Sequence, residues 1–160
     1  MKQERVRRVR PDKDTYYLDI ALAVSKRSSC LRRHYGCVIV KDNIIIATGY
    51  NGSPRGEVNC CDVGECKRAD AERYKGYEVC SSVHAEQNAL IAASRDRLIG
   101  STVYLACEEY GVVTENIFSP GYEQYGWLED KNPLPCNICS NMLKNAGVTR
   151  VVNRGGEICL

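Results

Sequence analysis

The residue types and spacings that could support chemistry lie in two short stretches about fifty residues apart. The first holds His84 and Glu86, and the second is a Pro-Cys-x-x-Cys motif with Cys136 and Cys139. One histidine and two cysteines supply three zinc ligands, which leaves the fourth position of a tetrahedron open. Zinc enzymes keep that position for a water molecule whose pKa the ion lowers, whereas structural sites are closed by four protein ligands. We therefore predict a catalytic zinc ion, with Glu86 as a carboxylate that is not a ligand.

Helix starts explain how these side chains could meet. On a helix that begins near Val83, His84 and Glu86 both lie in the first turn, from which both can reach one site. Cys136 and Cys139 are three residues apart at the start of another helix, where the positive dipole end favours thiolates. Two other interpretations stay open, because an isolated Cys-x-x-Cys can be a redox pair and three such ligands can belong to a purely structural metal site.

Composition and charge narrow the class of protein. The chain has 160 residues and a net charge of +2, and it begins with a basic tail over residues 1–13, whose first ten residues hold five of the 22 basic groups. Without the first ten residues, 17 basic groups face 19 acidic ones, so the body, a single domain over residues 14–160, lacks the excess that nucleic-acid binding needs. No run reaches membrane-spanning length, and we expect no membrane partner and a cytoplasmic protein. The ten cysteines then suit metal binding better than disulfides.

The first part of the domain predicts a helix followed by two strands. Apolar residues recur at helical spacing over residues 14–28, with Asp14 as the expected N-cap. Residues 36–41 and 44–49 read as antiparallel strands joined by a tight turn at 42–43. Because both strands are apolar throughout, we expect the sheet to be covered on both faces.

The middle of the chain is rich in turns and cysteines. Residues 50–56 hold two glycines and a proline, which predicts a shaped loop at the end of a strand, suited to binding a substrate. The cysteine-rich segment 57–82 is polar, and we expect at most a short helix around residues 67–74. A helix over residues 84–94, which we expect to bury Leu90, Ile91 and Ala92, precedes a strand at residues 102–106.

The last part of the chain combines an insertion with a helix. Residues 107–132 are aromatic and rich in turn residues, and we expect an irregular, functional connection there. The second ligand helix should run over residues 137–146 and end at Gly147, before a strand at residues 148–152.

Three stretches together resemble the cytidine deaminase superfamily, and within it the deoxycytidylate (dCMP) deaminases of bacteria and their viruses. The stretches are residues 30–40, residues 49–56, and the pair formed by residues 84–90 and 135–139. The last pair carries the H-x-E and P-C-x-x-C signature of zinc nucleobase deaminases. The resemblance implies an α/β protein with three α/β/α layers, a central mixed sheet of about five strands, and a homohexamer.

The resemblance also implies an activity and its residues. The reaction would be hydrolysis of dCMP to dUMP for thymidylate synthesis, with dCTP as activator, accompanied by Mg²⁺, and dTTP as inhibitor. Glu86 would take a proton from water and pass protons to N3 and to the departing ammonia. Asn51 would bind the sugar hydroxyl, and the Ala85 amide would bind the pyrimidine O2. Apart from the resemblance, we select Arg55 in the same loop as the candidate to bind phosphate or an effector. The chain departs from the family pattern in the insertion and at Asn153, where a tyrosine often stands.

Other functions remain open at this point. A deaminase of another cytosine nucleotide such as dCTP, or of a nucleic-acid base such as a tRNA adenosine, would share the zinc motif. The basic tail is compatible with a nucleic-acid substrate, although the balanced charge of the domain argues against one. A third interpretation is a binding module that zinc stabilises without catalysis.

A second, structural zinc is the last expectation. Cys30, Cys60, Cys66 and Cys80 flank or lie within a segment that is too poor in large apolar residues to hold itself together. Four thiolates would close a tetrahedron, and related viral and bacterial dCMP deaminases resemble this arrangement at Cys30 and Cys60. Cys61 could replace Cys60, and His34 is a weaker substitute for Cys30. The alternative is that these residues are free thiols.

Overall fold

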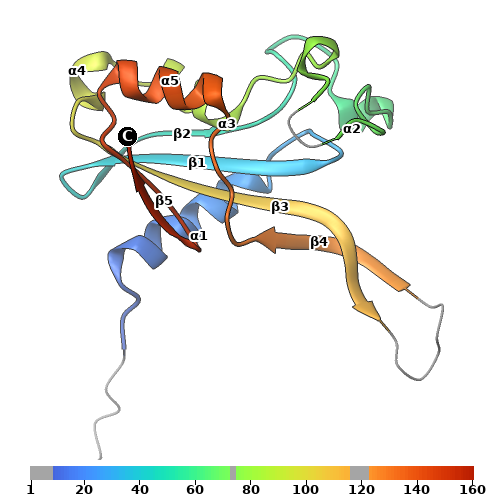
Figure 1. The fold of residues 1–160 in the computed structure, drawn as a ribbon, viewed down its shortest axis with the longest axis horizontal. Helices are drawn as coiled ribbons and strands as arrows, with labels where there is room; N and C mark the ends of the chain where they lie inside the picture. The colour runs from blue at the N-terminus through green and yellow to red at the C-terminus, as the bar shows by residue number, and fades with distance from the viewer. Residues whose placement is uncertain (1–8, 73–74, 116–122) are drawn as a thin grey trace, which may run out of the picture.

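The computed structural model describes residues 9–72, 75–115 and 123–160 and shows a sheet between two layers of helices (Figure 1). Five strands of the sheet follow the order β2 (Ile44–Tyr50), β1 (Arg33–Lys41), β3 (Thr102–Glu115), β5 (Arg150–Asn153) and β6 (Gly156–Cys159). β4 (Glu123–Asp130) pairs with the far part of β3. The pairing of β3 with β5 is parallel and the other pairings are antiparallel, so the sheet is mixed as expected. None of the helices within the described ranges is long and apolar enough to span a membrane.

The predicted hairpin is confirmed in β1 (Arg33–Lys41) and β2 (Ile44–Tyr50). Asp42 and Asn43 both have positive φ angles, 51° and 63°, as the tight turn between twisted strands requires. The expectation that both faces are covered holds for β1 but is wrong for the start of β2, where Ile44 and Ile45 are exposed. β2 is an edge strand, and these two residues directly follow the turn at Asp42 and Asn43.

Alternating residues of β1 belong to two separate hydrophobic clusters. Cys37 and Ile39 pack on one face with residues of α3 (Ala85–Ile91), α4 (Arg95–Leu98) and α5 (Asn137–Ala146). Val38 and Val40 pack on the other face with α1 (Lys13–Ser25). Strand β3 follows the same alternation, so each helical layer has its own core. The three-layer arrangement follows from this pattern.

Helix α1 (Lys13–Ser25) is the expected first helix, but its N-cap is Asp12, because the Asp12 carboxylate accepts the Thr15 N–H at 2.7 Å. Asp14 instead lies in the first turn, where it accepts hydrogen bonds from the Tyr104 hydroxyl at 2.7 Å and the Arg150 guanidinium at 2.6 Å. The prediction of Asp14 as N-cap is therefore wrong by two residues.

The predicted helix over residues 84–94 is divided into α3 (Ala85–Ile91) and α4 (Arg95–Leu98). Ser94 caps the second piece with extended backbone angles, which explains the break. Ala85, Glu86 and Ala89 are the buried face of α3, and Leu90 packs against the core. The expectation that Ile91 and Ala92 point inward is wrong, since both are exposed.

Residues 107–132 are more regular than expected. β3 (Thr102–Glu115) continues past its pairing with β1 and pairs with β4 (Glu123–Asp130), so the two strands project beyond the sheet (Figure 1). The pairing of the two strands with each other defines this ribbon, and the sequence predicted an irregular connection because pairing partners cannot be read from one strand alone. Residues 116–122 lie outside the described part.

The predicted second ligand helix is confirmed, the strand predicted over residues 148–152 begins two residues later, and one further strand was missed. α5 (Asn137–Ala146) ends at Gly147, whose φ of 90° is the left-handed angle that favours glycine there. β5 (Arg150–Asn153) is followed by β6 (Gly156–Cys159), which sequence reasoning missed because its four residues are all exposed.

The cysteine-rich segment contains little regular structure. α2 (Cys60–Val63) and a 3₁₀ turn, η1 (Tyr77–Val79), are its helical pieces among the described residues. We expected at most a short helix around residues 67–74. Residues 67–70 form turns, residues 71–72 have no regular structure, and residues 73–74 lie outside the described part.

Candidate active site

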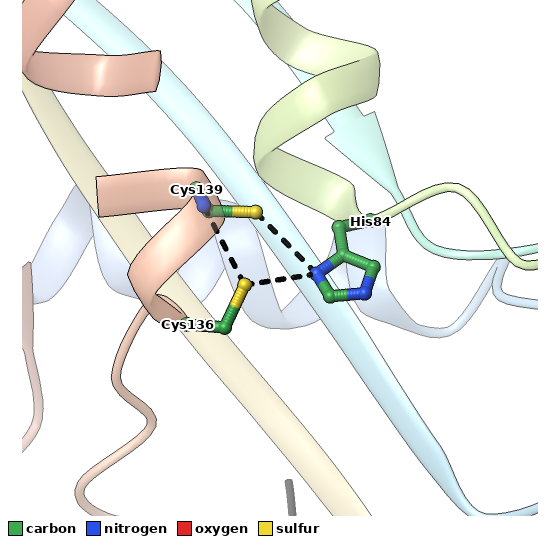
Figure 2. A group of neighbouring side chains, drawn as sticks. All are labelled: His84, Cys136 and Cys139. Carbon is green, nitrogen blue, oxygen red and sulfur yellow. Dashed lines mark hydrogen bonds between the residues drawn. The ribbon is translucent and has the colours of Figure 1, made fainter. Parts of the chain in front are cut away.

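The predicted zinc ligands meet at the facing N-termini of α3 and α5. His84 precedes α3, Cys136 is the N-cap of α5, and Cys139 lies in its first turn (Figure 2). The His84 Nδ1 atom lies 3.6 Å from the Cys136 sulfur and 3.4 Å from the Cys139 sulfur. In a zinc tetrahedron with ordinary Zn–N and Zn–S bond lengths, a nitrogen and a sulfur are about 3.5 Å apart. The geometry of the three side chains therefore fits a zinc ion.

The electrostatics of the site also favour a cation. Burial, and then the charge of Glu86, raise the pKa of the Cys139 thiol, so a thiolate there needs a positive partner. Burial, and then the nearby Arg68, lower the pKa of His84, which keeps its imidazole neutral and able to bind a metal. The backbone N–H of His84 donates to the Gln87 side-chain oxygen at 2.9 Å, and this hydrogen bond fixes the backbone just before α3.

Glu86 lies beside the ligands and is almost fully buried, with 3% of its surface exposed. Burial raises its pKa to about 7, so both protonation states are accessible near neutral pH. It lines a cleft together with His84, Cys136, Tyr35 and other residues. A carboxyl with these properties suits an acid-base group that first accepts and then donates a proton.

Gly49 in β2 lets α3 approach the sheet closely enough to place these groups. A Cβ at this position would lie 2.3 Å from the Ala85 carbonyl oxygen and 2.5 Å from the Ala89 nitrogen. Contacts that short do not occur between real atoms, so a larger residue would displace the helix. The position of Glu86 thus depends on a glycine in the neighbouring strand.

Comparisons with known proteins agree with this arrangement. The family model of the cytidine and deoxycytidylate deaminase zinc-binding region matches residues 11–154. The chain belongs to this family. It is 45% identical over 147 residues to the deoxycytidylate deaminase of Schizosaccharomyces pombe, a match that covers 91% of this chain and 38% of that protein. It is 35% identical over 150 residues to the deoxycytidylate deaminase of Mycobacterium phage D29, which covers 89% of this chain and 94% of the phage protein.

A solved structure gives a third comparison. The dCMP deaminase of cyanophage S-TIM5, in complex with dCMP and dUMP, is 27% identical with a TM-score of 0.59, and the match covers 90% of this chain and 82% of that one. The cytidine-deaminase-like fold is thus shown for this chain. The chain spans less than half the length of two fungal relatives, 38% of the Schizosaccharomyces pombe protein and 45% of the Saccharomyces cerevisiae protein.

In this deaminase domain, Asn51 is a structural clamp that also faces the cleft. Its side-chain oxygen accepts from the Tyr35 N–H at 2.7 Å and the Ser28 hydroxyl at 2.8 Å, and its amide nitrogen donates to the Arg33 carbonyl at 3.0 Å. One amide hydrogen is left for a ligand. Asn51 therefore holds the start of β1 against the loop that follows β2. Its second amide hydrogen could make the substrate contact that the sequence predicts.

The other expected substrate contacts fare differently. Ala85 is the first residue of α3, where backbone N–H groups have no partner within the helix, and it is buried beside the ligands. Arg55 is exposed in the loop after β2 and does not line the cleft. Asn153, at the position where the family often has tyrosine, donates to the Pro133 carbonyl at 2.9 Å and so supports the chain before Cys136.

The four other candidate ligands, Cys30, Cys60, Cys66 and Cys80, line a second cleft that adjoins the first. Burial, and then the neighbouring sulfurs of the other three, raise the pKa of Cys60, so the four side chains converge. Among the described residues, however, only the His84 group has three donor atoms within 4.8 Å of one another. His34 points elsewhere, because its Nε2 bonds the Cys30 carbonyl at 2.8 Å and its ring stacks on Trp127.

Sequence reasoning missed several residues of the first cleft. Arg68, Tyr77 and Ser82 line it although they belong to the cysteine-rich segment. No motif marks them, because the segment reaches the cleft through tertiary contacts. Arg32 supplies one such contact by donating to the carbonyl of Arg68 at 2.7 Å and to that of Ala71 at 2.9 Å.

Proposed function

We propose that this protein hydrolyses dCMP to dUMP and ammonia with a zinc ion held by His84, Cys136 and Cys139. The observation that carries the proposal is the zinc-compatible spacing of these three side chains beside the buried carboxyl of Glu86. The names of the relatives and the dCMP and dUMP bound to the cyanophage enzyme support this substrate.

The residues of the chain divide the work. A zinc ion bound here supplies a Lewis acid that makes a water molecule acidic enough to lose a proton near neutral pH. Glu86 accepts that proton and donates it to N3 of the cytosine as the water oxygen attacks C4. It then moves the remaining proton of this oxygen to the amino group, so the C4 carbonyl of dUMP forms as the C–N bond breaks and ammonia leaves. The Ala85 N–H at the start of α3 donates to the pyrimidine O2, and Asn51 donates its remaining amide hydrogen to the sugar hydroxyl.

Replacing Glu86 with Gln tests this proposal. The amide keeps the shape of the side chain but cannot accept a proton, so we expect kcat for ammonia release from dCMP to fall by about 10²- to 10⁴-fold, with zinc content unchanged. Glu78→Gln, in the exposed turn η1, is the matched control. Near wild-type kcat in Glu86→Gln would exclude the mechanism. If the wild type deaminated a tRNA anticodon stem and not dCMP, its substrate would be RNA and not the free nucleotide.

We also propose a structural zinc ion bound by Cys30, Cys60, Cys66 and Cys80. Their convergence on one cleft supports it, in a segment with little apolar core. The sulfurs would have to draw together on binding, since they do not form a cluster as tight as the first. With both sites filled, elemental analysis should give two zinc ions per chain, and Cys80→Ser should lose one and lower stability.

The exposed Cys159 offers a matched control, because Cys159→Ser removes a thiol outside both clefts. One zinc ion per chain in fully active wild-type protein would contradict the second site. If the Cys60→Ser variant still bound two zinc ions per chain, the ligand of the second site would be the neighbouring Cys61 and not Cys60.

The remaining proposals concern partners, and they rest on the family resemblance. We infer a homohexamer, activation by dCTP with Mg²⁺, inhibition by dTTP, and a cytoplasmic location. Light scattering of the purified protein and initial rates with each nucleotide test the first three. Rates that neither dCTP nor dTTP changes would show that this protein is not regulated by them.

A further inference from the structure

Two buried donor atoms in the first cleft have no hydrogen-bond partner in the described part of the chain. They are the Nε atom of Arg68 and the hydroxyl oxygen of Ser82. Both residues line the cleft that contains His84 and Glu86. Buried polar atoms in native proteins are nearly always paired, so an unpaired group in a cleft is evidence that a ligand supplies the partner. Two donors without a nearby acceptor call for an acceptor-rich ligand group.

Of the three arginines that line this cleft, Arg68 alone lacks a hydrogen-bond or ion-pair partner for its guanidinium within the described ranges. Arg33 forms ion pairs with Glu109 at 2.6 Å and with Asp130 at 3.8 Å. Arg32 donates to two backbone carbonyls, one of them that of Arg68 itself. Two of these positive charges are therefore engaged in structure, and the third is available for an anion.

Arg68 lies at a distance from the zinc ligands that suits contact with the 5′-phosphate of a nucleotide whose base is held at those ligands. Its guanidinium carbon stacks 4.0 Å from the centre of the Tyr77 ring, and that ring lies 5.4 Å from the His84 ring. The two separations place a ceiling of 9.4 Å on the distance from the guanidinium carbon to the His84 ring centre. A cytosine held at His84 would thus have its 5′-phosphate, one sugar ring away, within reach of Arg68.

We propose that Arg68, assisted by the Ser82 hydroxyl, binds the 5′-phosphate of the nucleotide and so makes the enzyme prefer dCMP over deoxycytidine. The inference rests on the proposed deaminase function and specifies its substrate contact. The planar guanidinium offers Nε–H and a terminal N–H side by side, which match two phosphate oxygens. Tyr77 holds the plane of the guanidinium by stacking, and Arg32 holds its backbone.

This assignment differs from the expectation based on the sequence, in which Arg55 was the candidate to bind phosphate or an effector. Arg55 is exposed outside the cleft, whereas Arg68 lies inside it. A direct comparison of the two arginines therefore tests the assignment.

The experiment measures binding and catalysis with matched pairs of ligands. Equilibrium affinities for dUMP and deoxyuridine, which are not deaminated, are compared with kcat/KM for dCMP and deoxycytidine. Wild type, Arg68→Ala, Arg68→Lys, Ser82→Ala and Arg55→Ala are tested, with Arg97→Ala on the exposed surface of α4 as control. Zinc content and circular dichroism check that each variant folds.

We expect Arg68→Ala to weaken dUMP binding and to lower kcat/KM for dCMP on the order of 10- to 100-fold, as for loss of a charged hydrogen-bonding group. The values for deoxyuridine and deoxycytidine should stay close to those of wild type, and the change for dCMP should lie mainly in KM. Arg68→Lys should keep part of the affinity, because it keeps the charge but not the paired donors. Ser82→Ala should cause a smaller loss in the same direction.

Other outcomes would overturn the assignment. Equal losses for nucleotide and nucleoside in Arg68→Ala would give Arg68 a purely structural role, and a selective loss in Arg55→Ala alone would move the phosphate to the loop. A wild type that releases ammonia from neither substrate would contradict the proposed function. The difference between dUMP and deoxyuridine binding would still decide on Arg68 in that case.

Discussion

Gly49→Ala is the substitution through which the fold should act most directly on catalysis. The added Cβ would lie 2.3 Å from the Ala85 carbonyl oxygen, whereas ordinary contacts begin at 3.4 Å, so the start of α3 must retreat by about 1 Å. His84 and Glu86 move with that helix end. A displacement of about 1 Å in catalytic groups costs on the order of 10²-fold in rate. Overpacking of this kind also costs about 1–3 kcal/mol of stability, or roughly 2–12 °C in Tm for a domain of this size.

Gly36→Ala is the matched control because it makes the same kind of clash on the opposite face of the sheet. There the Cβ would lie 2.0 Å from the Ala21 carbonyl oxygen in α1, a helix that carries no residue of the site. Both variants should lose stability in thermal denaturation, and Gly49→Ala alone should lose about 10²-fold in kcat for ammonia release. Equal kcat losses in the two variants, or an unchanged kcat in a destabilised Gly49→Ala, would refute the reasoning.

Two further predictions concern the support of the site. Asn51→Ala removes three part-buried hydrogen bonds, so unfolding by urea should show a loss of about 3 kcal/mol; a loss below about 1 kcal/mol would contradict the clamp. Burial lowers the pKa of His34 from 6.5, so the unfolded chain binds a proton more readily as pH falls through 6.5, and stability falls there. His34→Gln should flatten this part of the stability curve, measured through the fluorescence of the single tryptophan, and an unchanged slope would remove His34 as its source.

The candidate metal ligands and Glu86 could be predicted from the sequence because they lie in two local stretches of the chain. His84 and Glu86 lie within one helical turn, and Cys136 and Cys139 lie within another, so spacing alone fixes what each helix start presents. The turn at Asp42 and the end of α5 were predictable for the same reason, since backbone angles there depend on neighbouring residues.

What the sequence could not predict depends on distant partners. β3 and β4 pair with each other within the insertion. Buried strands are recognised in a sequence by apolar alternation, whereas these two are defined by their pairing, which the sequence of either strand alone does not reveal. Arg68 is similar, because the contact that brings it to the cleft is a hydrogen bond from Arg32, 36 residues earlier. An exposed loop residue such as Arg55 was the simpler choice for a phosphate contact as long as that tertiary contact was unknown.

The two proposed sites share lining residues. Zinc binding at the second site is therefore connected to the preference for dCMP at the first. Cys66 and Cys80 line both clefts, and Arg68 follows Cys66 by two residues. A zinc ion that joins Cys30 to Cys66 would therefore fix both ends of the contact between Arg32 and Arg68. On this reasoning, Cys80→Ser should weaken dUMP binding more than deoxyuridine binding, although Cys80 itself touches no phosphate. Loss of one zinc ion with the dUMP preference intact would show that Arg68 is held without the metal.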